Sequence, residues 1–161
     1  MKVTLVLLAA VLGSATAFGT GGDTPSIPLA VVVNRANPAD SVSIGELRKM
    51  LLLETLTWPN GKRLTLAIRE RGQRDRAALV PQICGMSDAD LVRFYLRAAF
   101  RGDELHGPKE LTSAEGVRKF VFNVPGAIGF LRADEVDATV KVLRVDLQLP
   151  GEPDYKVKVA P

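Results

Sequence analysis

The sequence predicts an α/β domain in which helices flank a mixed β-sheet. One observation is the continuous apolar run at 29–33, Leu-Ala-Val-Val-Val, which is typical of a strand buried on both faces. A second is the alternation of further short apolar runs with amphipathic segments, which favours a parallel or mixed sheet. A third is the Pro125-Gly126 pair, where a helical pattern stops and another apolar strand begins.

Four helices are predicted from three-to-four spacing of apolar residues and from polar residues that can cap the first turn. Ser43 and Glu46 have the spacing of a capping box, in which each side chain bonds to a backbone N–H of the other residue. Pro81 is expected to bend or end the second helix. The predicted helices are 44–54, 77–83, 88–98 and 114–121.

Glycine and tryptophan mark the strand starts and turns. We expect Gly126 to adopt a positive φ where the last helix ends, and Gly129 to let another group approach the strand backbone closely. Trp58 opens a tight turn and is expected to cover the sheet as a hydrophobic plug, the alternative being a contact residue. The strands predicted after 29–33 are 64–68, 127–131, 139–145 and 156–159.

The first residues have the features of an export signal. Lys2 precedes an apolar run, and small residues at 15–17 fit a cleavage site after Ala17, so we expect a periplasmic or secreted protein. The apolar run is too short to span a membrane, and stable membrane insertion is not predicted. The expected division is a signal peptide at 1–17, a flexible lead-in at 18–28, a single α/β lobe at 29–145 and a C-terminal extension at 146–161.

Composition excludes several classes of function. The chain has 21 Lys and Arg against 18 Asp and Glu, a near balance that gives no reason to expect nucleic-acid binding. It has one Cys, Cys84, interpreted as a buried inert thiol, and one His, His106, too few for a His/Cys metal site. Asp103, Glu104 and His106 are explained more simply as a polar loop than as an active site. We therefore predict no enzyme activity, metal or cofactor.

The order of several motifs resembles the phosphate-type periplasmic substrate-binding proteins of ABC transporters. The resemblance runs from about 29 to 145 and is strongest where the Trp turn and the Pro-Gly-Ala-Ile-Gly strand occur at the matching distance. It implies one lobe of a type II periplasmic-binding-protein-like fold; the full-length family holds its oxyanion between two lobes. The motifs that carry the resemblance are Val31–Asn34 with Asn37-Pro38, Ser43–Leu47, Trp58–Gly61, Phe100–Gly102 and Val124–Phe130.

The resemblance also implies an oxyanion site at a strand-to-helix junction. Arg69 and Gly72 match the arginine and first glycine of the family pattern, whereas Gln73, Arg74 and Asp75 stand in place of Ser, Gly and Thr. Helix N-terminal amides, a hydroxyl and a guanidinium bind the anion in that pattern. Here the hydroxyl is replaced, and the Asp75 carboxylate is expected to repel an anion.

Asn34 joins this list of ligand-binding candidates, because sites in such sheets lie beyond the carboxyl ends of strands. The four arginines at 69, 71, 74 and 76 are interpreted either as a patch for a small anion or an acidic partner, or as a solvated helix start with internal ion pairs.

The first hypothesis is therefore an exported module that binds a small oxyanion such as phosphate. The second is an interaction or accessory domain that has lost solute binding. If the chain binds a ligand, it uses a one-sided site, or the other lobe is supplied by a protein partner or a second copy.

Overall fold

The protein is described by a computed structural model over residues 26–101 and 107–160. The predicted signal peptide at 1–17, most of the predicted lead-in at 18–28, and Asp103, Glu104 and His106 lie outside the described residues.

The structure contains a seven-stranded mixed sheet with the strand order β2-β6-β1-β5-β3-β4, and β7 pairs with β1. β1 runs antiparallel to β5 and β6, whereas β3 runs parallel to β5 and β4. The predicted mixed sheet is confirmed. The strands are β1 (Ile27–Asn34), β2 (Ser41–Val42), β3 (Thr65–Arg69), β4 (Lys109–Leu111), β5 (Ala127–Arg132), β6 (Val140–Val145) and β7 (Lys158–Val159).

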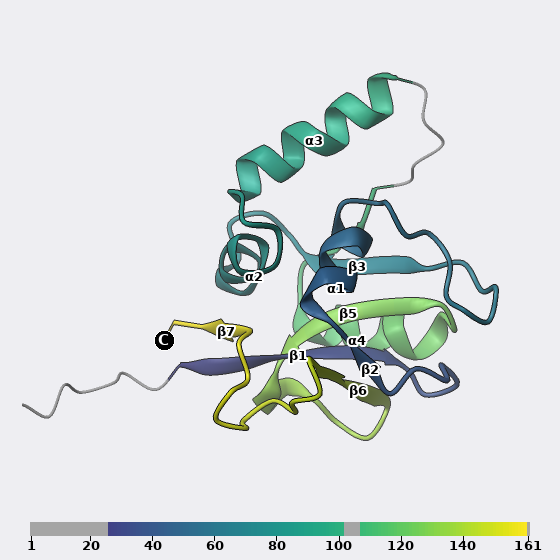
Figure 1. Cartoon of the computed structure of the whole chain (residues 1–161), viewed down its shortest axis with the longest axis vertical. Coiled ribbons are helices and arrows are strands. Elements are labelled where there is room, and N and C mark those ends of the chain that lie inside the picture. Colours follow the sequence, from purple (N-terminus) through teal and green to yellow (C-terminus); the bar gives the residue numbers. More distant parts are fainter. Residues whose placement is uncertain (1–25, 102–106, 161) are drawn as a thin grey trace, which may run out of the picture.

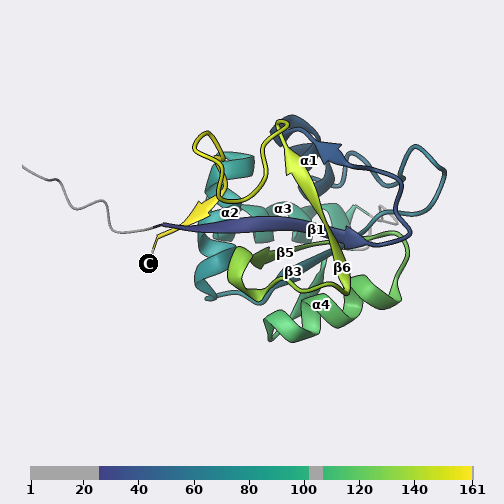
Figure 2. The ribbon, with the colours of Figure 1, turned by 90° about the horizontal axis from the view of Figure 1, so that it is seen from below.

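Helices cover both faces of the sheet (Figures 1 and 2). α4 lies on one face, α1 and α2 lie on the other, and α3 packs against α2 at the top of Figure 1. The helices are α1 (Ile44–Leu51), α2 (Arg74–Cys84), α3 (Asp88–Phe100), α4 (Ala114–Asn123) and the short 3₁₀ turn η1 (Ala133–Glu135).

A serine side chain caps the first turn of α1, α3 and α4. The Glu46 amide donates to Ser43 Oγ at 3.1 Å and the Ser43 amide donates to Glu46 Oε2 at 2.8 Å, which confirms the predicted capping box. Pro81 does not end α2, which continues to Cys84 and stops at Gly85 with a left-handed φ of 67°. The proline lacks an amide donor, but its carbonyl still accepts from the Gly85 amide at 2.9 Å, and the left-handed φ of Gly85 ends the helix.

The two faces of the sheet carry side chains of different size. Beneath α4 the strands present mainly small residues, among them Ala67 and Gly129. A Cβ atom at Gly129 would lie 2.8 Å from Val117 Cγ1 and 3.0 Å from Val121 Cγ2. The expected close approach at this glycine is therefore confirmed, and the group that approaches is α4.

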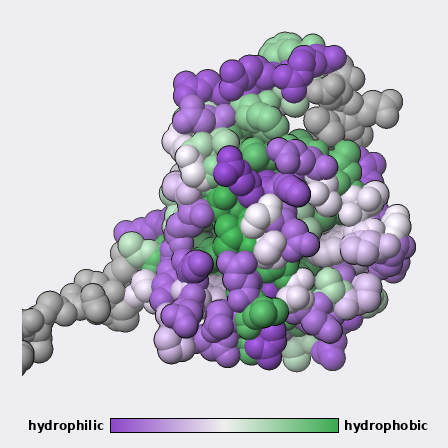
Figure 3. All heavy atoms as spheres, viewed as in Figure 1, coloured by the Kyte–Doolittle hydropathy of each residue, from purple (hydrophilic) through white to green (hydrophobic). Residues whose placement is uncertain are grey.

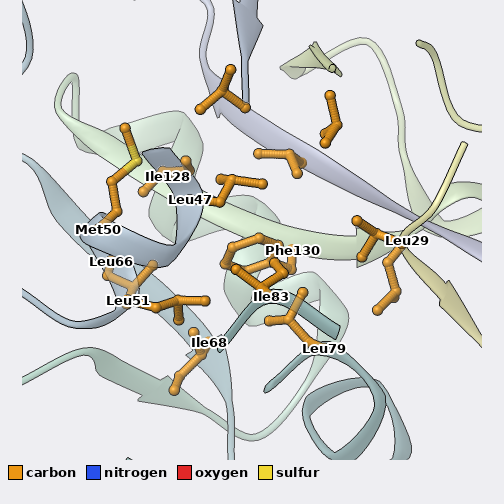
Figure 4. Close-up of a cluster of buried hydrophobic side chains, with 14 of the residues drawn as sticks. Leu29, Leu47, Met50, Leu51, Leu66, Ile68, Leu79, Ile83, Ile128 and Phe130 are labelled. Carbon is orange, nitrogen blue, oxygen red and sulfur yellow. The ribbon is translucent and has the colours of Figure 1, made fainter. Parts of the chain in front are cut away.

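The opposite face is lined with large side chains that pack against α1 and α2 (Figure 4). Phe130 of β5 lies near the centre of this cluster, with Leu47 of α1 and Leu79 and Ile83 of α2 around it. Cys84 is buried in the same cluster, as predicted, and burial raises the pKa of its thiol to about 11.

Trp58 is buried and covers the start of β5. Its Nε1 donates to the Gly126 carbonyl at 3.0 Å, and the Thr65 amide donates to the same oxygen. The plug interpretation of Trp58 is confirmed. The expected positive φ at Gly126 is wrong, because Gly126 is needed for space instead: a Cβ atom there would lie 1.9 Å from the Arg63 carbonyl oxygen.

The C-terminal residues complete the core beside β1. The Tyr155 hydroxyl donates to the Leu29 carbonyl, and the Leu29 amide donates to the Val157 carbonyl at 2.9 Å. Tyr155, Val157 and Val159 are all buried against the large-residue face of the sheet. This segment therefore holds the beginning of β1 in place.

We predict that Gly126→Ala destabilises the fold by about 2–3 kcal/mol, because the new methyl group overlaps a backbone oxygen that cannot move without shifting the turn before β3. The matched control is Gly45→Ala on the exposed side of α1, where a Cβ atom meets only Ser43 Oγ at 3.9 Å, and which we expect to be neutral or slightly stabilising. Urea denaturation of both variants measures the difference. Equal stability of the two would contradict the close contact at Gly126.

Candidate functional site

The parallel pair β3 and β5 ends at one edge of the sheet, where α2 begins. Arg69 is the last residue of β3 and Arg132 the last residue of β5. β1 runs the other way, so its first residue, Ile27, lies at this edge. This edge thus combines two strand ends with the start of a helix, an arrangement in which α/β sheets bind ligands.

Asn34 lies at the opposite edge, because it ends the antiparallel strand β1. Its Nδ2 donates to the Val121 and Phe122 carbonyls of α4 at 3.0 and 2.6 Å, and its Oδ1 accepts from the Ala36 amide at 2.9 Å. The structure therefore separates Asn34 from Arg69 and uses its buried side chain to hold the end of α4.

The first edge contains a pocket of about 200 Å³. Three of the predicted residues, Arg69, Gln73 and Arg74, line it, and Gly72 forms the preceding turn with a φ of 84°. The sequence reasoning missed Arg132 and Glu135, which reach the pocket only because β5 pairs beside β3. The full lining is Ile27, Arg69, Gln73, Arg74, Asp75, Arg132, Glu135, Val159 and Ala160.

The Arg69 guanidinium is fixed inside this edge. Its Nη2 donates to Gln73 Oε1 at 3.2 Å and to the Thr112 carbonyl at 3.1 Å, and the side chain is only 12% exposed. Its buried Nε has no hydrogen-bond partner among the described residues. Arg69 therefore places a fixed positive charge at the pocket, while its unpaired Nε lies inside the fold and out of reach of solvent.

The N-terminus of α2 points to the same place. Gln73 is the N-cap residue, and its side chain makes no capping bond. The partial positive charge at the start of α2 is therefore not offset by a capping side chain. Asp75, in the first turn, places a carboxylate in the pocket: it is 14% exposed and its Oδ2 lies 3.8 Å from Arg69 Nη1. The helix end attracts an anion and Asp75 repels it.

The remaining charges are partly paired with one another. Arg132 Nε and Nη2 donate to the two Asp134 oxygens at 3.1 and 2.7 Å, and these bonds lower the pKa of Asp134. Glu135 Oε2 accepts from the Arg132 amide at 3.1 Å. Arg74 is exposed at the mouth of the pocket. The pocket can thus hold a small anion through Arg69, Arg74 and the α2 amides, against the opposition of Asp75.

Arg76 lies behind the pocket and is fully buried. Its Nε donates to Asp88 Oδ1 at 2.6 Å and its Nη1 donates to Glu110 Oε1 at 2.7 Å and to the Arg69 carbonyl at 3.2 Å. Burial opposes its charge, but the bonds to Glu110 and Asp88 raise its pKa. The four arginines at 69, 71, 74 and 76 are therefore not one surface patch: Arg76 joins α2, α3 and β4 from within.

Known proteins resemble this chain in fold. No known family profile matches the sequence, and no curated protein is similar to it in sequence. Among solved structures, a Clostridium perfringens protein assigned as the substrate-binding protein of a phosphate ABC transporter, solved with bound phosphate, aligns with a TM-score of 0.70 at 16% identity over 83% of this chain and 53% of its own. An ABC-type phosphate transport receptor of Vibrio cholerae aligns with a TM-score of 0.68 at 18% identity, over 83% of this chain and 54% of its own.

PstS of Borrelia burgdorferi aligns with a TM-score of 0.67 at 11% identity over 84% of this chain and 55% of its own. The chain thus spans about half the length of these proteins. The predicted resemblance is confirmed at the level of the fold: the chain has the α/β fold of periplasmic binding proteins. Its described helices include none long and apolar enough to cross a membrane.

We predict that Arg76→Met destabilises the protein by about 2–4 kcal/mol, because Asp88 and Glu110 keep their charges and lose the buried cation between them. Arg93→Met is the matched control: Arg93 pairs with Asp90 on the exposed side of α3 and should cost less than about 1 kcal/mol. Urea denaturation distinguishes them. If Arg76→Met were as mild as the control, the buried ion pairs would not support the pocket.

Proposed function

We propose that this chain is an exported binding module that holds a small oxyanion, such as phosphate, weakly at the pocket at the end of β3. The observation that carries the proposal is the Arg69 guanidinium, which is fixed at the pocket beside the start of α2, where no side chain caps the helix. Both groups favour a negative charge at one point. The export is inferred from the predicted signal at 1–17. The pocket offers binding groups and no nucleophile paired with a base.

Weak affinity is expected from the charges that line the pocket. The negative charges of Asp75 and Glu135 offset the positive charges of the three arginines that line the pocket. Asp75 also forms an ion pair with Arg69 at 3.8 Å. We therefore expect a dissociation constant on the order of 1–10 mM for phosphate on this lobe alone. A partner protein or a second copy that supplied an opposing lobe would remove the anion from water and strengthen the interaction.

The first test is a titration of the purified protein with phosphate and sulfate by calorimetry and thermal shift. We expect saturable heat in the millimolar range, and a loss of at least about fivefold in affinity for Arg74→Gln, which removes an exposed pocket charge without disturbing the core. Arg144→Gln, on the exposed side of β6, is the control for general charge and should bind as the unmodified protein does. If millimolar phosphate or sulfate produced no binding heat and no thermal shift, this function would be excluded.

The second test removes the repulsion. Asp75→Asn keeps the size of the side chain and deletes its charge, so we expect phosphate affinity to rise about tenfold, equivalent to about 1.4 kcal/mol. Glu152→Gln, remote from the pocket, serves as the matched charge control. Unchanged affinity in Asp75→Asn would mean that the anion binds elsewhere.

The alternative is an interaction or accessory domain that keeps the lobe as a scaffold. The observation that favours it is the Asp75 carboxylate itself, which stands beside Arg69 where the family pattern has a hydroxyl. Under this alternative the unmodified protein binds no anion and Asp75→Asn restores binding. The paired titrations therefore separate the two functions.

A further inference from the structure

α3 carries an apolar face that the fold leaves uncovered among the described residues. Leu96 is 53% exposed and Phe100 is 88% exposed, although both are large apolar side chains. Val92, Leu96 and Ala99 follow the three-to-four spacing of one helix face. Val92, Leu96 and Ala99 form one wall of a groove of about 380 Å³ between α3 and the body of the protein, and Phe100 lies next to this wall as the last residue of α3.

The other wall of this α3 groove comes from the chain just after α1, from the chain before β4 and from β4 itself. It is lined by Leu53, Pro108 and Glu110, and Tyr95 lies between the walls. The Tyr95 hydroxyl donates to the Leu51 carbonyl at 2.6 Å, and Glu110 is bound by Arg76. The polar groups of the groove are thus used within the fold, and what it offers a partner is mainly apolar surface.

Cations lie along the outside of the groove. Arg97 is exposed on α3 next to the apolar face, Arg101 is exposed just after the helix, and Arg71 lines the opposite side. Arg93 is on the same outer side and pairs with Asp90. Figure 3 shows a hydrophilic row over α3 with hydrophobic residues between it and the body. An apolar groove with a basic border is complementary to an acidic amphipathic segment.

We propose that the α3 groove binds an acidic amphipathic helix of a partner protein, whose apolar face packs against Leu96 and Phe100 while its carboxylates meet Arg71 and Arg97. A helix is the fitting occupant because the exposed apolar residues form one helix face, against which a second helix packs by interlocking side chains. A flat lipid surface would touch only the convex tip of α3 and leave the hollow between α3 and β4 unfilled. This interaction is independent of the proposed anion pocket.

The test uses a synthetic, fluorescein-labelled helical peptide of about 18 residues, or five turns, with leucine at three-to-four spacing and glutamate on the flanking positions. A matched peptide carries lysine in place of each glutamate. Fluorescence anisotropy with the full chain should give a dissociation constant on the order of tens of micromolar for the glutamate peptide and none for the lysine peptide. Backbone amide shifts on binding should centre on Leu53, Ala99 and Gly107.

Leu96→Ser and Phe100→Ser should each lower the affinity for the peptide by at least about fivefold. Because both side chains are exposed, neither substitution should affect folding. Leu147→Ser is the matched control: Leu147 is 71% exposed after β6 and should bind unchanged, as should the anion-pocket variant Arg74→Gln. Arg97→Gln should weaken binding most at low salt.

Equal binding of the two peptides, or unchanged binding in both Leu96→Ser and Phe100→Ser, would overturn the proposal. Phe100-dependent binding to phosphatidylglycerol vesicles without peptide binding would overturn it in favour of a lipid surface. A Phe100-dependent dimer in sedimentation, again without peptide binding, would overturn it in favour of a second copy.

Discussion

The parallel pairing of β3 with β5 determines both the site and the packing around it. The pairing starts where the Thr65 amide and Trp58 Nε1 both donate to the Gly126 carbonyl. The two strands pair as far as Ala67 and Gly129, and then continue to Arg69, beside the turn into α2, and to Arg132 at the same edge. Because Gly126 has no side chain, the two backbones can approach closely enough for this start to form. A shift at this contact would change the position of Arg69 relative to Arg132.

Arg76 gives the pocket and the α3 groove a common support. It donates to the Arg69 carbonyl on one side and to Glu110, a residue of the groove, on the other. A buried cation with two carboxylates adds little net stability, but it fixes geometry, because removing any partner leaves a charge without compensation. Arg76 therefore links α2, α3 and β4 in addition to their apolar packing.

The fold and the pocket support different kinds of statement about this protein. Solved phosphate-binding proteins share the fold, but function depends on the groups at the site. In this chain Arg69 ends β3 beside the start of α2, and the Asp75 carboxylate lies 3.8 Å from its guanidinium. Under the proposed function, the balance between these two charges sets how strongly the lobe binds an anion.

The sequence alone determined the features that depend on neighbouring residues: the capping box of Ser43 and Glu46, the strand at 127–131 and the close approach at Gly129. Through the resemblance to the phosphate-type family, it also placed Arg69, Gly72, Gln73 and Arg74 at one strand-to-helix junction. Tertiary structure decided what depends on distant pairing. Strand direction placed Asn34 at the far edge and brought Arg132 to the pocket, since backbone hydrogen bonds between remote strands set that direction. The sequence shows an arginine; only the assembled core shows whether it is buried or exposed.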